Sequence, residues 1–101
     1  MAIKTGRPAT RIGDADVPHC SGMVRNVGSP NVFVGGIPWS RQGDVNTPHL
    51  LPGDPCPTHA APIAIGSSTV RVNGRGAGRV GDAIAGCTSV AVGLPTVLVG
   101  G

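Results

Sequence analysis

The chain has 101 residues and a formal net charge of +3, which fits one small basic domain. A domain of this size buries only about two thirds of the surface that its unfolded chain exposes. Seventeen glycines and ten prolines exclude a protein built of long helices. Because Phe33 and Trp39 are its only aromatic residues, the hydrophobic core is expected to be small and to need additional stabilisation.

Cysteine usage and the lack of long apolar runs indicate where the chain is made. Its three cysteines are odd in number and form no paired C-x-x-C motifs, which argues against a secreted disulfide framework. Residues 1–10 lack the apolar core of a signal peptide, and no run approaches the roughly 18 apolar residues of a membrane span. We therefore expect synthesis in the cytoplasm, with any later export performed by a dedicated secretion apparatus rather than through a cleaved signal peptide.

The first predicted element is a strand over residues 7–11, Arg-Pro-Ala-Thr-Arg, which matches only the returning half of a β-hairpin. Its expected partner lies at the other end of the chain, where Val97 and Val99 alternate with other residues. We predict that Val97 to Val99 pairs with residues near Pro8 to Ile12, which would bring both termini to one hairpin.

A turn of the form Arg-x-Gly-Asp follows and occurs three times. The copies are Arg11 to Asp14, Arg41 to Asp44 and Arg79 to Asp82. Glycine permits a backbone angle that is costly for other residues, and an aspartate can accept backbone N–H bonds within a turn. The three aspartates are therefore expected to be structural.

Glycine-led blocks with alternating valines follow the turns, after connections of unequal length. The blocks span residues 28–36, 66–74 and 93–101 and align without a gap. Period-two alternation predicts strands, with the valines on one face and Phe33, Arg71 and Leu98 on the other. Because Gly35-Gly36 and Asn73-Gly74 are hairpin-turn dipeptides, each block is expected to begin a hairpin. The sequence thus predicts an all-β fold of three pseudo-equivalent hairpin repeats around an axis.

Three side chains that can bind a metal stand at one equivalent position of the repeats. Five residues after the turn aspartates lie His19, His49 and Cys87. The long second connection, residues 45–65, can return His59 as a fourth ligand, with Cys56 as the competing candidate and Cys20 less favoured. Three imidazoles and one thiolate suit tetrahedral zinc. Four protein ligands leave no position for water, so this one zinc ion would be structural, contributing on the order of 10 kcal/mol to folding.

Two other function classes compete with a structural metal protein. A metallohydrolase would use Asp16 or Asp54 as a general base beside an incomplete metal site, but the chain has no Glu and therefore no H-E-x-x-H helix, and no Gly-x-Ser-x-Gly elbow. We therefore expect no enzyme. A zinc-stabilised nucleic-acid-binding module would use the seven arginines, although these are dispersed rather than clustered.

The repeated turns and blocks resemble those of the PAAR-repeat proteins, named for Pro-Ala-Ala-Arg. The chain reads Pro-Ala-Thr-Arg at residues 8–11, Pro-Trp-Ser-Arg at 38–41 and Gly-Ala-Gly-Arg at 76–79, and the resemblance extends from about Thr5 to Gly101. These departures change returning strands and leave the turns and the candidate ligands intact.

The resemblance implies a small cone-shaped domain with zinc held near the apex by three His and one Cys. Carried onto this chain, the ligands are His19, His49, His59 and Cys87. The resemblance also implies a cap on the trimeric β-helical spike of type VI secretion systems or contractile phage tails, translocated into the target on firing. Residues 1–101 would form a single domain without an N- or C-terminal effector extension, in transient contact with the target membrane.

Overall fold

The computed structural model describes residues 6–18, 22–50 and 58–100. In order, its strands are β1 (Arg7–Ala9), β2 (Phe33–Val34), β3 (Ile37–Pro38), β4 (His49–Leu50), β5 (Thr58–His59), β6 (Arg71–Val72), β7 (Arg75–Gly76) and β8 (Leu94–Val99). These described residues contain no helix, so the all-β prediction is confirmed. Consequently, none of them forms a helix able to cross a membrane.

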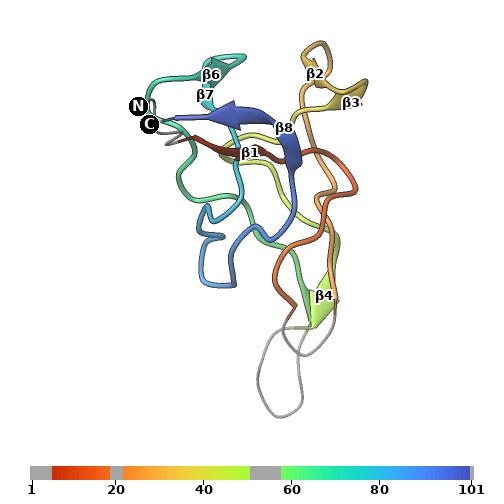
Figure 1. Cartoon of the computed structure of the whole chain (residues 1–101). Coiled ribbons are helices and arrows are strands. Elements are labelled where there is room, and N and C mark those ends of the chain that lie inside the picture. The colour runs from red at the N-terminus through yellow and green to blue at the C-terminus, as the bar shows by residue number, and fades with distance from the viewer. Residues whose placement is uncertain (1–5, 19–21, 51–57, 101) are drawn as a thin grey trace.

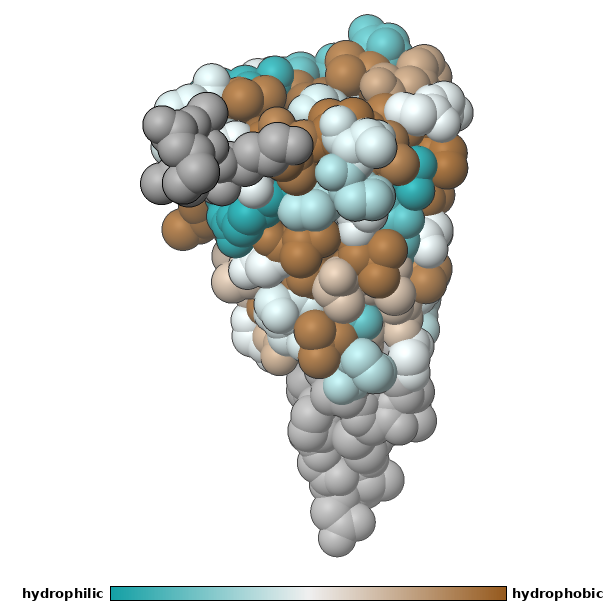
Figure 2. Space-filling view, viewed as in Figure 1, coloured by the Kyte–Doolittle hydropathy of each residue, from teal (hydrophilic) through white to brown (hydrophobic). Residues whose placement is uncertain are grey.

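The strands form four antiparallel pairs rather than one continuous sheet. Figure 1 shows β2–β3, β6–β7 and β1–β8 together at one end of the molecule, which we call the wide end, and β4 at the opposite, narrow end. The described surface narrows between these two ends (Figure 2). Three hairpins at the wide end thus match the three predicted repeats.

Two hairpin turns have the geometry that their dipeptides predict. Gly35 and Gly36 have φ angles of 57° and 80°, and Asn73 and Gly74 have 54° and 78°. Positive φ at both central residues identifies type I′ turns, whose twist matches that of the flanking strands. These two-residue turns fix the strand register, in which Val34 pairs with Ile37 and Val72 pairs with Arg75.

The third hairpin joins the two ends of the described chain. Arg7 pairs with Val99 and Pro8 with Leu98, and an irregularity then shifts the partner of Ala9 to Leu94. The predicted closure is therefore confirmed, but the pairing starts one residue earlier and does not extend to Ile12. The Ile12 amide donates instead to the Pro38 carbonyl, 3.1 Å away, because the chain has already turned toward the next hairpin.

The three Arg-x-Gly-Asp turns are nearly superimposable in their internal geometry. Their glycines, Gly13, Gly43 and Gly81, have φ angles of 88°, 89° and 86°. In each turn the aspartate accepts the backbone N–H of the arginine three residues earlier and pairs with its guanidinium, at 3.1, 2.8 and 2.9 Å for the closest ionic contacts. Hydrogen bonding to Asp44 raises the pKa of Arg41, while burial acts in the opposite direction. The structural role predicted for these aspartates is confirmed.

A closed ring of backbone hydrogen bonds joins the three repeats at their centre. Thr10 N–H donates to Gly78 O at 3.1 Å, Gly78 N–H to Ser40 O at 3.0 Å, and Ser40 N–H to Thr10 O at 3.0 Å. All three residues are buried and occupy the position before the turn arginine. We call this the axial ring, because each repeat is bonded to both others around one pseudo-three-fold axis.

Two small apolar clusters lie along this axis. The upper core, toward the wide end, contains Ala9, Val34, Val72, Ala77 and Val99, and the lower core contains Ala61, Ile63, Ile84 and Val90. The predicted strand faces are confirmed except at Val70, which is exposed. The Val32 carbonyl accepts the N–H of Trp39, and Val32 packs against the upper core. The Val70 carbonyl accepts the N–H of Ala77, whose side chain is much smaller than that of Trp39.

We predict that Gly78→Ala lowers the free energy of unfolding by about 1–3 kcal/mol, the usual cost of overpacking. A Cβ atom at Gly78 would collide with the Ser40 carbonyl oxygen and lie 2.9 Å from both Ile63 Cδ1 and Thr10 Cγ2. The matched control is Gly22→Ala, where nothing lies within 4 Å of an added Cβ. Chemical denaturation measures both, and equal stability of the two variants would contradict the role of the axial ring.

Candidate metal centre

The three connections carry the predicted ligands and are joined in pairs by single β-bridges, Asp16 to Val90, Arg25 to Asn46 and Ile63 to Ile84. His49 begins β4, and Cys87 stands in the tight turn of the third connection, residues 83–92. The third predicted ligand, His19, lies outside the described residues, as do Cys20, Asp54 and Cys56. Two of the three pseudo-equivalent ligand positions can therefore be placed.

The backbone brings His49 and His59 together. They are direct register partners in the antiparallel pair β4–β5, with Leu50 opposite Thr58 as the next pair. Directly opposite residues of an antiparallel pair share one face, with Cβ atoms about 4.5–5.5 Å apart in general. The proposal that the second connection returns a second histidine beside the first is therefore compatible with its backbone register.

Cys87 lies in a turn that holds it against the lower core. Its N–H donates to Ile84 O at 3.0 Å, and Ile84 N–H donates to Thr88 O at 2.8 Å, which closes the turn with Gly86 at a φ of 60°. The side chain is half-buried and packs against the lower core. Burial raises the pKa of the Cys87 thiol, and a hydrogen bond from Asn46 partly opposes this shift. A cation bound here would supply the charge that stabilises the thiolate.

A buried polar cluster lies beside Cys87. Arg25 and Asp16 have no exposed side-chain surface and form an ion pair at 3.1 Å. Arg25 Nη2 also donates to Asp44 O at 2.7 Å, and Asn46 Nδ2 donates to Asp16 Oδ2 at 3.1 Å. Burial lowers the pKa of Arg25, and the charge of Asp16 acts in the opposite direction. We call Asp16, Arg25 and Asn46 the polar cluster.

The polar cluster occupies positions that are apolar in the third repeat. Arg25, Ile63 and Val90 each donate an N–H to the turn aspartate of their own repeat, which makes them equivalent. Asp16, Asn46 and Ile84 are likewise equivalent, each two residues after that aspartate. Sequence reasoning missed this cluster, although the substitution of Asp and Asn for Ile at one repeat position was a visible signal.

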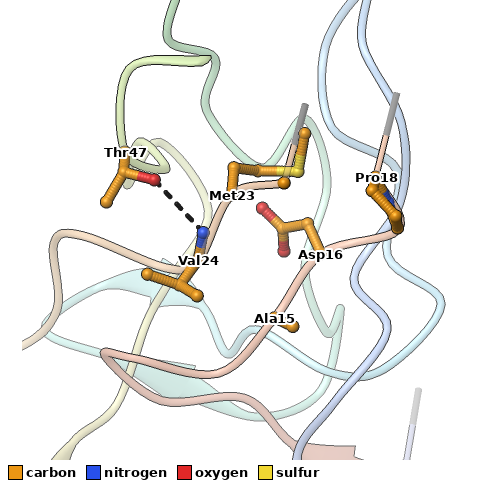
Figure 3. A pocket seen from close by; sticks show the side chains of 7 residues that line it. Ala15, Asp16, Pro18, Met23, Val24 and Thr47 are labelled. Carbon is orange, nitrogen blue, oxygen red and sulfur yellow. Dashed lines mark hydrogen bonds between the residues drawn. The ribbon is translucent and has the colours of Figure 1, made fainter. Parts of the chain in front are cut away.

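Asp16 also lines an open pocket beside the first connection. The lining residues are Ala15, Asp16, Pro18, Gly22, Met23, Val24 and Thr47. Figure 3 shows the Asp16 carboxylate directed toward Met23, and the Val24 N–H bonded to Thr47 Oγ1 at 3.2 Å. Because this carboxylate accepts hydrogen bonds from Arg25 and Asn46, its arrangement is that of a structural group rather than of a general base.

Within the residues whose placement is described, no group of three or more His, Cys, Asp or Glu is positioned to hold a metal ion. Cys87, half-buried, and the register partners His49 and His59 are nevertheless of the residue types that bind zinc. The four-ligand site proposed from the sequence stays a prediction.

The described chain is thus a small all-β protein in which three pseudo-equivalent turns and hairpins surround one axis. A search among curated proteins returned no significant match. The family model for the PAAR motif matches residues 14–85, which is most of the chain. The chain belongs to the PAAR-motif family, a structural family associated with the spike tips of secretion and phage-tail systems.

The polar cluster generates a prediction about stability. We expect Arg25→Val to lower the free energy of unfolding by about 3–5 kcal/mol, because Asp16 would remain charged and buried without its partner. The double variant Arg25→Val with Asp16→Ile installs the residues of the third repeat, Val90 and Ile84, and should recover a large part of that loss.

Urea denaturation in excess chelator compares these variants without any contribution of metal. Arg71→Val, at an exposed position of β6, is the control and should leave stability nearly unchanged. A double variant less stable than Arg25→Val alone would show that the ion pair is not the source of the loss.

Proposed function

We propose that the protein is a non-enzymatic tip that caps the trimeric β-helical spike of a contractile injection apparatus and aids penetration of the target envelope. The observation that carries this proposal is the pseudo-three-fold arrangement of three hairpins at the wide end (Figure 1). A single chain with three equivalent hairpins can match the end of a three-fold symmetric partner, one cap for each trimer. The family match supports the same role.

The wide end offers equivalent exposed residues to such a partner. Phe33 on β2, Arg71 on β6 and Leu98 on β8 occupy the same position of the three blocks and are all exposed, with Phe33 at 54%. Their strands belong to two-stranded pairs, so each hairpin also has edges able to accept a further strand. We propose that this surface seats on the blunt end of the spike.

The narrow end requires another source of rigidity. The upper and lower cores contain mostly alanine, valine and isoleucine, and β4–β5 pairs only two residues on each side. We propose that His19, His49, His59 and Cys87 hold one structural zinc ion there, with Cys56 as the alternative to His59. A closed tetrahedral site would tie all three connections together and resist unfolding under load.

The arginines favour this tip over a nucleic-acid-binding module. All seven lie in the described part of the chain, and six of them form ion pairs with aspartates. Positive charge that is neutralised within the fold contributes little to the release of counterions from a phosphate backbone.

We propose synthesis in the cytoplasm, assembly at the spike, and delivery into the target with the spike, where effectors could travel with it.

For the zinc site, we predict that His49→Ala lowers the melting temperature on the order of 10 °C or more in the presence of zinc, since a domain this small shifts several degrees per kcal/mol. In excess chelator the variant and the unaltered chain should melt alike. Differential scanning calorimetry measures both conditions.

Val17→Ala, an exposed position in the first connection, is the control for this experiment and should follow the unaltered chain in both conditions. If zinc does not raise the melting temperature of the unaltered chain, the proposed site is wrong. If zinc stabilises the chain and His49→Ala equally, His49 is not a ligand.

For the spike contact, we predict that Phe33→Asp weakens binding to a trimeric β-helical spike fragment at least tenfold, because a charge would be buried where an apolar ring is expected. Titration calorimetry measures the affinity, and light scattering should give one chain for each trimer. Ile65→Asp is the matched control, since Ile65 is even more exposed but lies in the second connection. Stronger weakening by Ile65→Asp than by Phe33→Asp would assign the contact to another surface.

A further inference from the structure

We propose that the side chain of Arg11 is an open hydrogen-bond donor at the wide end, and that it binds a backbone carbonyl oxygen at the blunt end of the spike. The inference rests on the proposed spike contact. It goes beyond that contact, because it assigns one polar bond to one of the three junctions between neighbouring repeats. The other two junctions complete the equivalent bond within the chain.

The junction between the first and second hairpins is closed by a side chain. Asn73, in the turn between β6 and β7, places its Oδ1 atom against the first repeat. This oxygen accepts hydrogen bonds from Arg41 Nη1 at 3.0 Å and from Ser29 Oγ at 2.6 Å. Arg41 uses its other two nitrogens, Nε and Nη2, for the turn carboxylate of Asp44. Every guanidinium nitrogen of Arg41 therefore has an acceptor.

The junction between the second and third hairpins is closed by the backbone. Gly100 occupies the position of Asn73 in its own block. Its carbonyl oxygen accepts hydrogen bonds from Arg79 Nη1 at 3.0 Å and from Ser67 Oγ at 2.7 Å. These two donors are the counterparts of the arginine and the serine in the first junction. An amide oxygen and a main-chain carbonyl thus fill the same position.

The junction between the third and first hairpins lacks this oxygen. The counterpart of Asn73 is Gly35, which has nearly the same turn geometry, with a φ of 57° against 54°, but no side chain. Leu94 stands where the other junctions have serine. Arg11 Nε and Nη2 bind Asp14, as in the other turns, but Arg11 Nη1 has no acceptor within the described part of the chain. The third junction is therefore open.

The unused nitrogen lies beside Gly35. A Cβ atom built on Gly35 would be 3.3 Å from Arg11 Nη1 and 3.1 Å from Leu94 Cδ2. The Arg11 side chain is 16% exposed, more than its counterparts in the other two turns, at 9% and 6%. Among the described residues, Arg11 Nη1 is not one of the fully buried side-chain atoms that lack a partner, so water reaches it.

A partner seated on the wide end would displace this water. A guanidinium nitrogen that loses water without gaining an acceptor costs free energy, so a fitting partner must supply an oxygen there. The bond to the Gly100 carbonyl shows which kind of oxygen this donor position accepts. The last strands of a β-helix present unpaired backbone carbonyls, and a trimer presents each of them three times. One of the three copies then meets Arg11 in any of the three equivalent seatings.

Two substitutions in the full chain remove the contact from opposite sides. Gly35→Asn installs the residue of the second hairpin, which tolerates a positive φ, so that an oxygen of the chain itself occupies Arg11 Nη1. Arg11→Lys keeps a positive charge beside Asp14 and removes Nη1. Each variant is expected to bind the trimeric β-helical spike fragment about tenfold more weakly, measured by titration calorimetry.

The double variant tests whether both substitutions remove the same bond. If they do, Gly35→Asn with Arg11→Lys should bind no more weakly than either single variant. Arg41→Lys is the matched control, because it makes the same change at the equivalent turn, where Nη1 is already bonded to Asn73. It should lower the melting temperature of the chain and leave the affinity for the spike fragment unchanged.

A further comparison keeps the inference testable if Arg11→Lys does not fold. Gly35→Ala adds the same Cβ atom as Gly35→Asn but no oxygen, and the folded variant should keep nearly native affinity for the spike fragment. Equal weakening by the two substitutions would show that bulk at Gly35, rather than occupation of the donor, is responsible, and would overturn the inference.

Other results would overturn the inference while leaving the spike contact in place. These are additive losses of affinity in the double variant, an equal loss from Arg41→Lys, or unchanged affinity in both single variants alongside the expected loss from Phe33→Asp. A native chain that does not bind the spike fragment would instead remove the proposed function itself.

Discussion

The axial ring formed by Thr10, Ser40 and Gly78 is the constraint on which the rest of the structure depends. The described strands pair only two by two, so no continuous sheet joins the three repeats. Each backbone N–H of the ring bonds to the repeat on one side and each carbonyl to the repeat on the other. Such buried backbone groups are costly to leave unpaired. The ring therefore fixes the spacing of the three turns and, through them, the directions of the hairpins and the connections.

The two ends of the molecule differ in how closely the three repeats follow the pseudo-three-fold symmetry. At the wide end, the repeats stay nearly equivalent, and their exposed positions suit a partner of true three-fold symmetry. Toward the narrow end, the equivalence is broken, because Asp16 and Asn46 stand where the third repeat has Ile84. This asymmetry gives the first two connections a buried polar cluster where the third has apolar side chains. In the spike tip that we propose, the wide end would match the spike and a metal ion would link the connections at the narrow end.

Sequence reasoning recovered the features that depend on local chemistry. The glycine φ angles, the aspartate bonds in the turns and the type I′ dipeptides follow from residues two to four positions apart, and the structure has all of them. The sequence also predicted the pairing of β1 with β8, because residues 7–11 match only the returning half of a hairpin and therefore need a partner strand from elsewhere in the chain. The polar cluster of Arg25, Asp16 and Asn46 was missed: Asp and Asn in place of Ile at one repeat position were visible in the sequence, but nothing in the sequence showed that Arg25 is buried beside them. The structure identifies the position of Arg25 as core, because Arg25 is fully buried and its counterparts in the other repeats, Ile63 and Val90, pack in the lower core.

The central claim is that three copies of one turn direct their connections to a single cation. The most direct measurement is zinc K-edge X-ray absorption on the purified chain, combined with its metal content. The account predicts one zinc per chain with three nitrogen neighbours at about 2.0–2.1 Å and one sulfur neighbour at about 2.3 Å. A chain that carries no zinc at stoichiometric level, or a zinc ion without a sulfur neighbour, would contradict it.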